Sequence, residues 1–430
     1  MKWNSTRNPE HEVSLKEALF MGLAPDGGLF MPASETNHVV GESSSLVETA
    51  HAFLAPFVQP EISEAKLTEI LTHALNFEIP VVEISEGVFV LELFHGPTLA
   101  FKDVGGRVMA GLLEAVYDNP EPLTILAATS GDTGSAVASA FLGKPGFRVV
   151  LLFPSGQVSE IQERQLTTFG QNVTTLEVAG TFDDCQKLVK QAFSDVDLRK
   201  VVNLTSANSI NIGRWLPQAV YYHHAWNQMQ AKLPGCKPVA AVPSGNLGNV
   251  AAGLMALRHG ASFSNVIVAC NENKSFFDFM QTANFEPRAS IRTVSNAMDV
   301  GNPSNFERIA TLYKHDLAAM KQDIYATTHS DATTTEAIKH VFESTGYLMD
   351  PHTAVGYLGW KQYQSATGTK EPVVILSTAH PAKFGDVIEH ATGTPPEIPP
   401  RLAACFTAEK QSIKMQPDYN AFESFLKTLK

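Results

Sequence analysis

Short hydrophobic runs rich in β-branched residues alternate, through most of the chain, with amphipathic segments of helical length. This alternation is typical of a mostly parallel sheet whose faces are covered by helices. In the segment "DVGGRVMAGLLEAVYD", for example, Val104, Val108, Leu112 and Val116 recur at i+4 spacing and share one face of the predicted helix. The hydrophobic runs predict strands over residues 88–94, 124–129, 148–153, 173–179, 239–244, 266–270, 324–328 and 373–377.

The alternating pattern is confined to part of the chain, which predicts its domain organisation. A chain of 430 residues exceeds the usual size of a single hydrophobic core. We expect a helix-rich N-terminal unit over 1–87, a smaller α/β lobe over 88–230 and a larger α/β lobe over 231–400, with a cleft between the lobes. The prolines of "TGTPPEIPPRLAA" forbid a continuous helix and mark the start of a C-terminal tail, 401–430.

Composition narrows the classes of function. The formal net charge is −12 and 44% of the residues are hydrophobic, which is typical of a folded protein and disfavours binding to nucleic acid. The N-terminus lacks the hydrophobic core of a signal peptide, and no uncharged run approaches membrane-spanning length, so we expect a cytoplasmic protein without a membrane segment. Cys185, Cys236, Cys270 and Cys405 lack metal-site spacing, so we expect inert thiols and no metal.

A glycine-containing loop, "GNLGN" at 245–249, lies between a predicted strand and a predicted helix. Gly245 and Gly248 allow the backbone to approach a ligand closely, and the free N–H groups at the start of the next helix favour a phosphate. The loop lacks the residues of the common nucleotide-binding motifs. An ordinary strand-to-helix turn capped by asparagine is the alternative.

A second loop of the same kind, "SGDT" at 130–133, also follows a predicted strand. Its N–H groups and the hydroxyls of Ser130 and Thr133 are suited to a carboxylate. Asp132 opposes an anion here unless its side chain points away or caps the helix. A capped α/β turn without a ligand is again the alternative.

Lys102 stands between Phe101 and Asp103, where a turn meets the predicted helix. Taken alone, it would be a solvated surface residue. Two anion-binding loops on separate lobes, with one lysine at the start of another helix, instead suggest a cofactor whose phosphate is held apart from its reactive carbon. Pyridoxal 5'-phosphate fits, because a lysine forms a Schiff base with its aldehyde. Thr378, after the last predicted strand, could bond to the pyridine nitrogen, or could cap the helix that begins near Pro381.

Several motifs together resemble the threonine synthases of the longer bacterial and yeast type. They are "FHGPTLAFKD", "ATSGDTGSA", "PSGNLGN", "DPHTA" and "STAHPAKF", and the opening "STRNPEHEVSLKEALFMGLAPDGGLFMP" is similar to the N-terminal signature of that family. The resemblance implies a pyridoxal-phosphate lyase of fold type II, the class of the tryptophan synthase β subunit. It also implies the conversion of O-phospho-L-homoserine and water to L-threonine and phosphate.

The resemblance assigns roles to residues at matching positions. Lys102 would be the Schiff-base lysine, and the cofactor would also contact Gly245, Asn246, Leu247, Gly248, Asn249 and Thr378. The substrate carboxylate would bind Ser130, Gly131, Asp132 and Thr133. The segment "SANSINIGRWLPQ" supplies Ser209, Asn211 and Arg214, which match a segment that binds the substrate phosphate, and a guanidinium is suited to phosphate oxygens.

The sequence leaves some points open. The segment "NENKSFFDF", residues 271–279, departs from the expected pattern, and Asp350 and His352 match a family motif without an individual role. Two alternative functions remain, a serine or threonine dehydratase-like lyase and a non-catalytic protein that binds phosphometabolites. We expect the small-molecule substrate to be the partner, with no nucleic acid or membrane, and a monomer or weak homo-oligomer.

Overall fold

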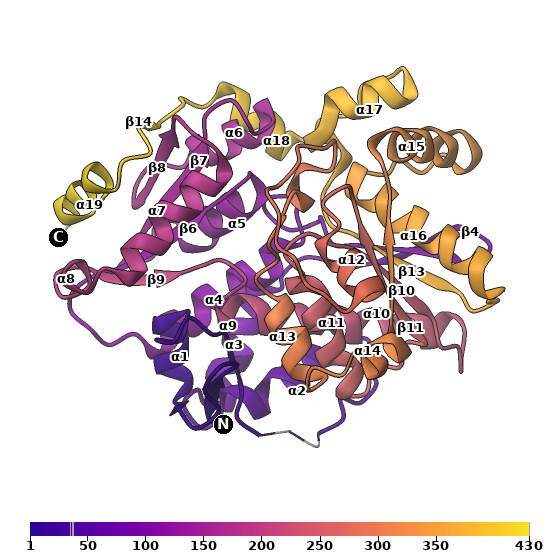
Figure 1. Cartoon of the computed structure of the whole chain (residues 1–430), viewed down its shortest axis with the longest axis horizontal. Coiled ribbons are helices and arrows are strands. Elements are labelled where there is room, and N and C mark those ends of the chain that lie inside the picture. The colour runs from indigo at the N-terminus through magenta and orange to yellow at the C-terminus, as the bar shows by residue number, and fades with distance from the viewer. Residues whose placement is uncertain (35, 37, 430) are drawn as a thin grey trace.

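The computed structural model describes residues 1–34, 36 and 38–429, and its larger sheet has six strands (Figure 1). The strand order is β12-β11-β10-β13-β5-β4, and all neighbours are parallel except β4 and β5. Every residue of β10, β11 and β13 is buried, as expected for a parallel sheet with both faces covered. The strands are β4 (Val81–Ser85), β5 (Val88–Glu92), β10 (Val239–Pro243), β11 (Asn265–Cys270), β12 (Ile324–Thr328) and β13 (Val373–Ser377).

A second sheet has five strands in the order β14-β8-β7-β6-β9, and all of its pairs are parallel. The register places Leu126 of β6 opposite Val150 of β7, and Leu152 of β7 opposite Leu176 of β8. The strands are β6 (Leu123–Ala128), β7 (Phe147–Pro154), β8 (Val173–Val178), β9 (Asn203–Ser206) and β14 (Ile413–Met415).

Helices cover both sheets, and Figure 1 shows the two sheets side by side with their helices around them. Helix α16 packs against β10, β11 and β13, while α5 and α7 pack against β6 and β7. With the larger sheet lie α10 (Ala219–Lys232), α11 (Gly248–Arg258), α12 (Ser275–Thr282), α13 (Phe306–Leu312), α14 (Leu317–Asp323), α15 (Asp331–Thr345), α16 (Pro351–Thr367), the 3-10 turn Pro381–Phe384 and α17 (Gly385–Thr392). With the smaller sheet lie α4 (Lys102–Val116), α5 (Asp132–Phe141), α6 (Glu160–Thr167), α7 (Phe182–Ser194), α8 (Val196–Arg199), α9 (Ile212–Trp215), α18 (Pro400–Thr407) and α19 (Tyr419–Thr428).

The N-terminal segment combines a small antiparallel sheet with three helices. The sheet order is β2-β1-β3, and the elements are β1 (Trp3–Ser5), β2 (Glu12–Val13), α1 (Leu15–Met21), β3 (Phe30–Pro32), α2 (Leu46–Val58) and α3 (Glu64–Ala74). Helix α1 packs on β9, α2 on α10 and α3 on α4. The fully buried Trp3 and Phe53 belong to the same hydrophobic cluster as Val149 of β7 and Val242 of β10. The N-terminal segment therefore shares its core with both sheets.

The strands predicted from hydrophobic runs are all present, each within two residues of its predicted ends, and the predicted helix after Lys102 is α4. Two strands lie where chain order alone would not place them. Strand β5, at the start of the range 88–230, pairs with β13 in the larger sheet, and β14 of the C-terminal tail pairs with β8 in the smaller one. The division into domains at 87, 230 and 400 stays a prediction.

Among residues 1–34, 36 and 38–429, no helix is both long and apolar enough to cross a bilayer.

Candidate active site

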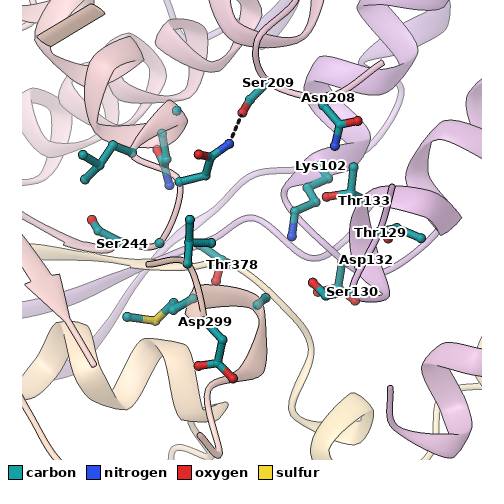
Figure 2. Close-up of a pocket in the computed structure, with 18 of the residues that line it drawn as sticks. Lys102, Thr129, Ser130, Asp132, Thr133, Asn208, Ser209, Ser244, Asp299 and Thr378 are labelled. Atoms are coloured by element: carbon teal, nitrogen blue, oxygen red, sulfur yellow. Dashed lines mark hydrogen bonds between the residues drawn. The ribbon is translucent and has the colours of Figure 1, made fainter. Parts of the chain in front are cut away.

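A cavity lies where the loops after β6, β10 and β13 and the start of α4 come together (Figure 2). Ligand sites of parallel α/β sheets characteristically form at the carboxyl ends of the strands, because strand-to-helix loops converge there. Apart from Gly131 and Asn211, every site residue predicted from the sequence lines this cavity. They are Lys102, Ser130, Asp132, Thr133, Ser209, Arg214, Gly245, Asn246, Leu247, Gly248, Asn249 and Thr378.

Lys102 is the first residue of α4. Hydrogen bonds to the loop that follows β13 of the larger sheet hold the turn before it. The Phe101 N–H donates to the Thr378 carbonyl over 2.9 Å, and the His380 N–H donates to the Leu99 carbonyl over 3.1 Å. The buried Asp103 carboxylate accepts from the N–H and the hydroxyl of Thr98 at 2.8 and 2.7 Å. The side chain of Lys102 consequently reaches into the cavity beside Thr378.

The electrostatic surroundings of Lys102 favour a neutral amine. Burial lowers the pKa of Lys102 to about 8, and the positive charges of Lys383 and Arg214 lower it too, while the negative charge of Asp132 acts in the opposite direction. The N-terminus of α4 also disfavours a cation at this position. An amine that is half neutral near pH 8 is suited to attack an aldehyde.

The loop 245–249 offers a row of backbone donors at the start of α11. Within the described chain, the N–H groups of these five residues form no hydrogen bond with another protein group. Leu247 has a φ of 60°, a left-handed conformation that a leucine rarely adopts and that turns the N–H groups into a concave anion site. A Cβ at Gly245 would come within 2.7 Å of the Met298 backbone, so only glycine fits there. These features fit a phosphate.

The loop 130–133 has a similar construction at the start of α5. In the part of the chain that the structure describes, the N–H groups of Ser130, Asp132 and Thr133 have no hydrogen-bond partner, whereas the Gly134 N–H donates to Thr129 Oγ1 over 2.8 Å. Gly131 has a φ of 132°, and a Cβ there would clash with Gln162, which explains the glycine. Asp132 does not compete for these N–H groups, because its carboxylate bonds to Lys383 and Gln162. The loop can therefore accept a carboxylate.

Thr378 does not cap the helical turn that follows it. His380 is the N-cap of the turn Pro381–Phe384, and its Nδ1 accepts from the Ala382 N–H over 3.1 Å. Thr378 is 7% exposed and lines the cavity close to Lys102, as Figure 2 shows. Its hydroxyl is thus placed for a ligand atom and not for the backbone.

Of the three residues predicted in segment 209–214, Ser209 and Arg214 line the cavity and Asn211 does not. Arg214 is a nearly buried guanidinium that lines the cavity, and its Nε has no hydrogen-bond partner among the described residues. Burial lowers the pKa of Arg214 to about 10, so the group stays charged near neutral pH and is suited to an anion. Ser209 lines the cavity and accepts from the amides of Asn246 and Asn305 at 3.1 and 2.9 Å. Asn211 is fully buried and bonds to the protein interior, where it caps α9.

Sequence reasoning missed two buried cations beside the cavity. Lys383 forms an ion pair with Asp132 at 2.9 Å. Arg308 is fully buried, lies over the ring of Trp215 at 4.3 Å and donates to the carbonyls of Ser209 and Ile210, both at 2.7 Å. Lys383 stands in the motif "STAHPAKF", but a lysine or arginine gives no sign in sequence of whether it is buried.

Polar residues on the side of the larger sheet, His352 and Asp299, also line the cavity. His352 accepts from the Ala297 N–H at 3.2 Å through Nε2, and its Nδ1 lies 2.7 Å from Asp350 Oδ1. Asp299 also lines the cavity, and burial raises its pKa to about 6. Asp299 accepts from Asn271 and Asn273 of the unusual segment 271–279, at 2.9 and 3.1 Å. That segment therefore supports the wall of the cavity.

These residues fit pyridoxal phosphate. A lysine with a lowered pKa, a concave row of unpaired N–H groups and a threonine hydroxyl line one cavity, and they match the aldehyde, the phosphate and the ring nitrogen of the cofactor. Fold and site together define a pyridoxal-phosphate-dependent enzyme of fold type II. The family model described as pyridoxal-phosphate dependent enzyme matches residues 76–379.

Comparisons with known proteins identify the family within this class. The models for the threonine synthase N terminus and the threonine synthase C-terminal region match residues 2–75 and 353–426. The threonine synthase of Haemophilus influenzae is 38% identical over 99% of both chains. The crystal structure of threonine synthase from Escherichia coli is 37% identical with a TM-score of 0.90 and covers 100% of both chains. The crystal structure of the PLP-bound threonine synthase from Brucella melitensis is 34% identical with a TM-score of 0.91, over 100% of this chain and 99% of that one. The chain belongs to the threonine synthase family, and its cofactor is pyridoxal phosphate.

Proposed function

We propose that this cavity converts O-phospho-L-homoserine and water to L-threonine and phosphate, with Lys102 as the group that binds the cofactor and moves protons. The observation that carries this assignment is the position of Lys102 between two separate anion-binding loops, with an additional buried guanidinium, Arg214, on the same cavity. The substrate of this reaction carries one amine, one carboxylate and one phosphate. Its cofactor adds a second phosphate, so three anionic groups need three sites.

The three anion sites divide by chemistry. We assign Gly245, Asn246, Leu247, Gly248 and Asn249 to the cofactor phosphate, because the row of N–H groups at α11 is suited to a dianion. The N–H groups and hydroxyls of Ser130, Asp132 and Thr133, together with the turn that Gly131 makes, take the substrate carboxylate. Arg214 takes the substrate phosphate with Ser209 beside it, and Asn211 holds this segment in place by capping α9.

Thr378 sets the electronic character of the site. Its hydroxyl would bond to the ring nitrogen of the bound cofactor and would leave the ring closer to neutral than a carboxylate would. When bound, pyridoxal phosphate supplies an electron sink that stabilises negative charge on the substrate carbon next to the amine.

Lys102 then carries out the proton transfers. Once its amine is released, Lys102 Nζ takes the proton from the α-carbon of the substrate and is placed to exchange protons at the β- and γ-carbons. Phosphate leaves from the γ-carbon toward Arg214, and water adds at the β-carbon. One amine that acts as base and acid in turn requires exclusion of water between steps, so we expect the two lobes to close over the substrate.

The direct test is incubation of the reconstituted protein with O-phospho-L-homoserine, followed by chromatography for threonine and an assay for phosphate. We expect equal amounts of both products and no product from Lys102→Ala, with the exposed Lys200→Ala as a matched control that retains activity. Phosphate without threonine would support a dehydratase-like lyase instead. If the protein forms neither product nor a violet-absorbing, borohydride-trappable adduct with the cofactor, the proposal fails.

The partner and the compartment belong to the same proposal. The homologues are biosynthetic enzymes that act on small molecules, and we infer a cytoplasmic enzyme that is a monomer or a weak homo-oligomer.

A further inference from the structure

A completely buried ion pair joins Asp132, which lines the cavity, to Lys383 behind it. Lys383 Nζ is 2.9 Å from Asp132 Oδ1, and the two side chains are 0% and 2% exposed. Asp132 also accepts from Gln162 Nε2 over 3.1 Å. Burial alone would raise the pKa of Asp132, but the charges of Lys383 and Lys102 hold it well below its ordinary value. The Asp132 carboxylate is therefore ionised within a site that has to receive another carboxylate.

The pair connects the two halves of the molecule. Asp132 opens α5 beside the smaller sheet, whereas Lys383 stands in the turn that follows β13 of the larger sheet. The Ser159 hydroxyl of α6 donates to the Lys383 carbonyl over 3.2 Å, and Asn296 donates to Gln162 Oε1 over 3.3 Å. Lys383 is thus held at its carbonyl by Ser159 and at its Nζ by Asp132, while Gln162, the second partner of Asp132, is held by Asn296.

The direction of the Asp132 side chain decides what the loop 130–133 can bind. An aspartate at the start of a helix ordinarily accepts from the helix's own N–H groups, and this would occupy the donors that a ligand needs. Here Lys383 and Gln162 hold the carboxylate, Thr129 Oγ1 accepts from the Gly134 N–H of the first turn, and the N–H groups of Asp132 and Thr133 have no partner among the described residues.

We propose that Lys383 is a positioning residue that makes the loop 130–133 competent for the substrate carboxylate, by neutralising Asp132 and holding its side chain away from the loop N–H groups. This inference rests on the proposed function, in which that loop receives the carboxylate. Without Lys383, the Asp132 carboxylate would lose its buried partner and would turn to the helix N-terminus or repel the incoming ligand.

The test compares two ligands that differ only in the carboxylate. O-phospho-L-homoserine has an amine, a phosphate and a carboxylate, and 3-aminopropyl phosphate is the same molecule without the carboxylate. We expect Lys383→Met, as the holoenzyme, to bind the substrate about tenfold or more weakly, because a buried charged partner is lost, and to bind 3-aminopropyl phosphate with unchanged affinity. The measurements are the KM of the substrate and the inhibition constant of the analogue.

The double variant Asp132→Asn/Lys383→Met removes both charges and should restore the wild-type preference for the substrate to within about threefold. It also tests the proposal if Lys383→Met alone fails to fold. Lys410→Met, which changes an exposed ion pair with Glu163, is the matched control and should leave both constants unchanged.

Two results would overturn the proposal. In one, Lys383→Met weakens both ligands equally, which indicates a purely structural pair; in the other, the double variant does not recover the preference. A third result, equal affinity of the wild-type enzyme for both ligands, would overturn the carboxylate role of the loop and with it the role of Lys383; the wild-type measurement thus separates this failure from the first two.

Discussion

At the scale of single residues, the site combines an amine that is easily neutralised with cations that stay charged. Burial is the main cause in Lys102, whose pKa falls to about 8, and Arg214 remains a cation because its pKa falls only to about 10. A lysine loses its charge on burial at a pH where an arginine retains it. The lysine is thus suited to covalent attachment of the cofactor, and the arginine is suited to binding an anion.

The pKa of Lys102 predicts the pH dependence of cofactor capture by the apoenzyme. Only the neutral amine attacks the aldehyde, so the rate should fall about tenfold per unit as the pH decreases below 8, and should level off above it. The measurement is the growth of violet absorbance after mixing with pyridoxal phosphate, with Lys102→Ala as the blank. A rate that continues to rise up to pH 10 would contradict the shift, since the ordinary value is 10.5.

Arg214 should act on the phosphate of the substrate alone. We expect Arg214→Met to weaken O-phospho-L-homoserine and 3-aminopropyl phosphate equally, by about tenfold or more, because both ligands carry the phosphate. The exposed Arg199→Met is the matched control. The measurements are KM and the inhibition constant; loss of affinity for the substrate only would assign Arg214 to the carboxylate instead.

At the scale of elements, two helix N-termini form the proposed sites for the cofactor phosphate and the substrate carboxylate. Both α5 and α11 begin directly after a strand-ending loop, and both leave their first N–H groups without partners among the residues that the structure describes. The left-handed conformations of Gly131 and Leu247 set the entry into these helices. The segments around α9 and α13 close the site from the side through Arg308, which bonds to the carbonyls of Ser209 and Ile210.

The loop 245–249, which precedes α11, is packed so closely that one added methyl group should disturb it. A Cβ at Gly245 would lie 2.7 Å from Met298 Cα, so the loop or its neighbour has to move. We expect Gly245→Ala to raise the dissociation constant of pyridoxal phosphate by about tenfold or more while the melting temperature of the apoenzyme changes little. Gly385→Ala is the matched control, because no atom lies within 4 Å of its added Cβ. Unchanged cofactor affinity would contradict the assignment of the loop.

At the scale of the whole molecule, a negatively charged protein has to admit an anionic substrate. The net charge is −12, but a hollow of about 550 Å³ that adjoins the site is lined by three cations, Lys187, Lys190 and Arg288, against two carboxylates, Asp183 and Asp299. The hollow shares Phe182 and Asp299 with the active-site cavity and therefore lies directly beside it. Local positive charge at such a position increases the encounter rate with an anion.

This charge distribution predicts a salt-dependent effect of two surface lysines. Lys187→Gln/Lys190→Gln should lower kcat/KM about threefold at low ionic strength and leave it unchanged near 0.5 M salt, where the screening length is only about 4 Å. The double variant Lys200→Gln/Lys427→Gln makes the same change of net charge on surface residues outside the hollow and should have a smaller effect. Equal effects of both pairs would show that only net charge matters.

Much of the fold and of the site could be predicted from the sequence because the signals are local. Hydrophobic runs mark the buried strands, and glycines mark the turns at 131 and 245 where a side chain would clash. Lys102 and Thr378 are recognisable from their motifs. The sequence could not show that β5 joins the larger sheet, because strand pairing depends on segments far apart in the chain. The partner of β5 is β13, which begins some 280 residues after β5 ends.

The sequence by itself determined the strands and the helix after Lys102; it also identified the family and the residues that could meet the cofactor. Only the tertiary structure decided which of them share a cavity: Asn211 turns into the interior, while Lys383 crosses from the other lobe to Asp132, 251 positions away in the chain. The physical reason is that hydrophobic periodicity and turn chemistry are properties of neighbouring residues. Burial of a charge and its choice of partner are settled when distant segments pack together.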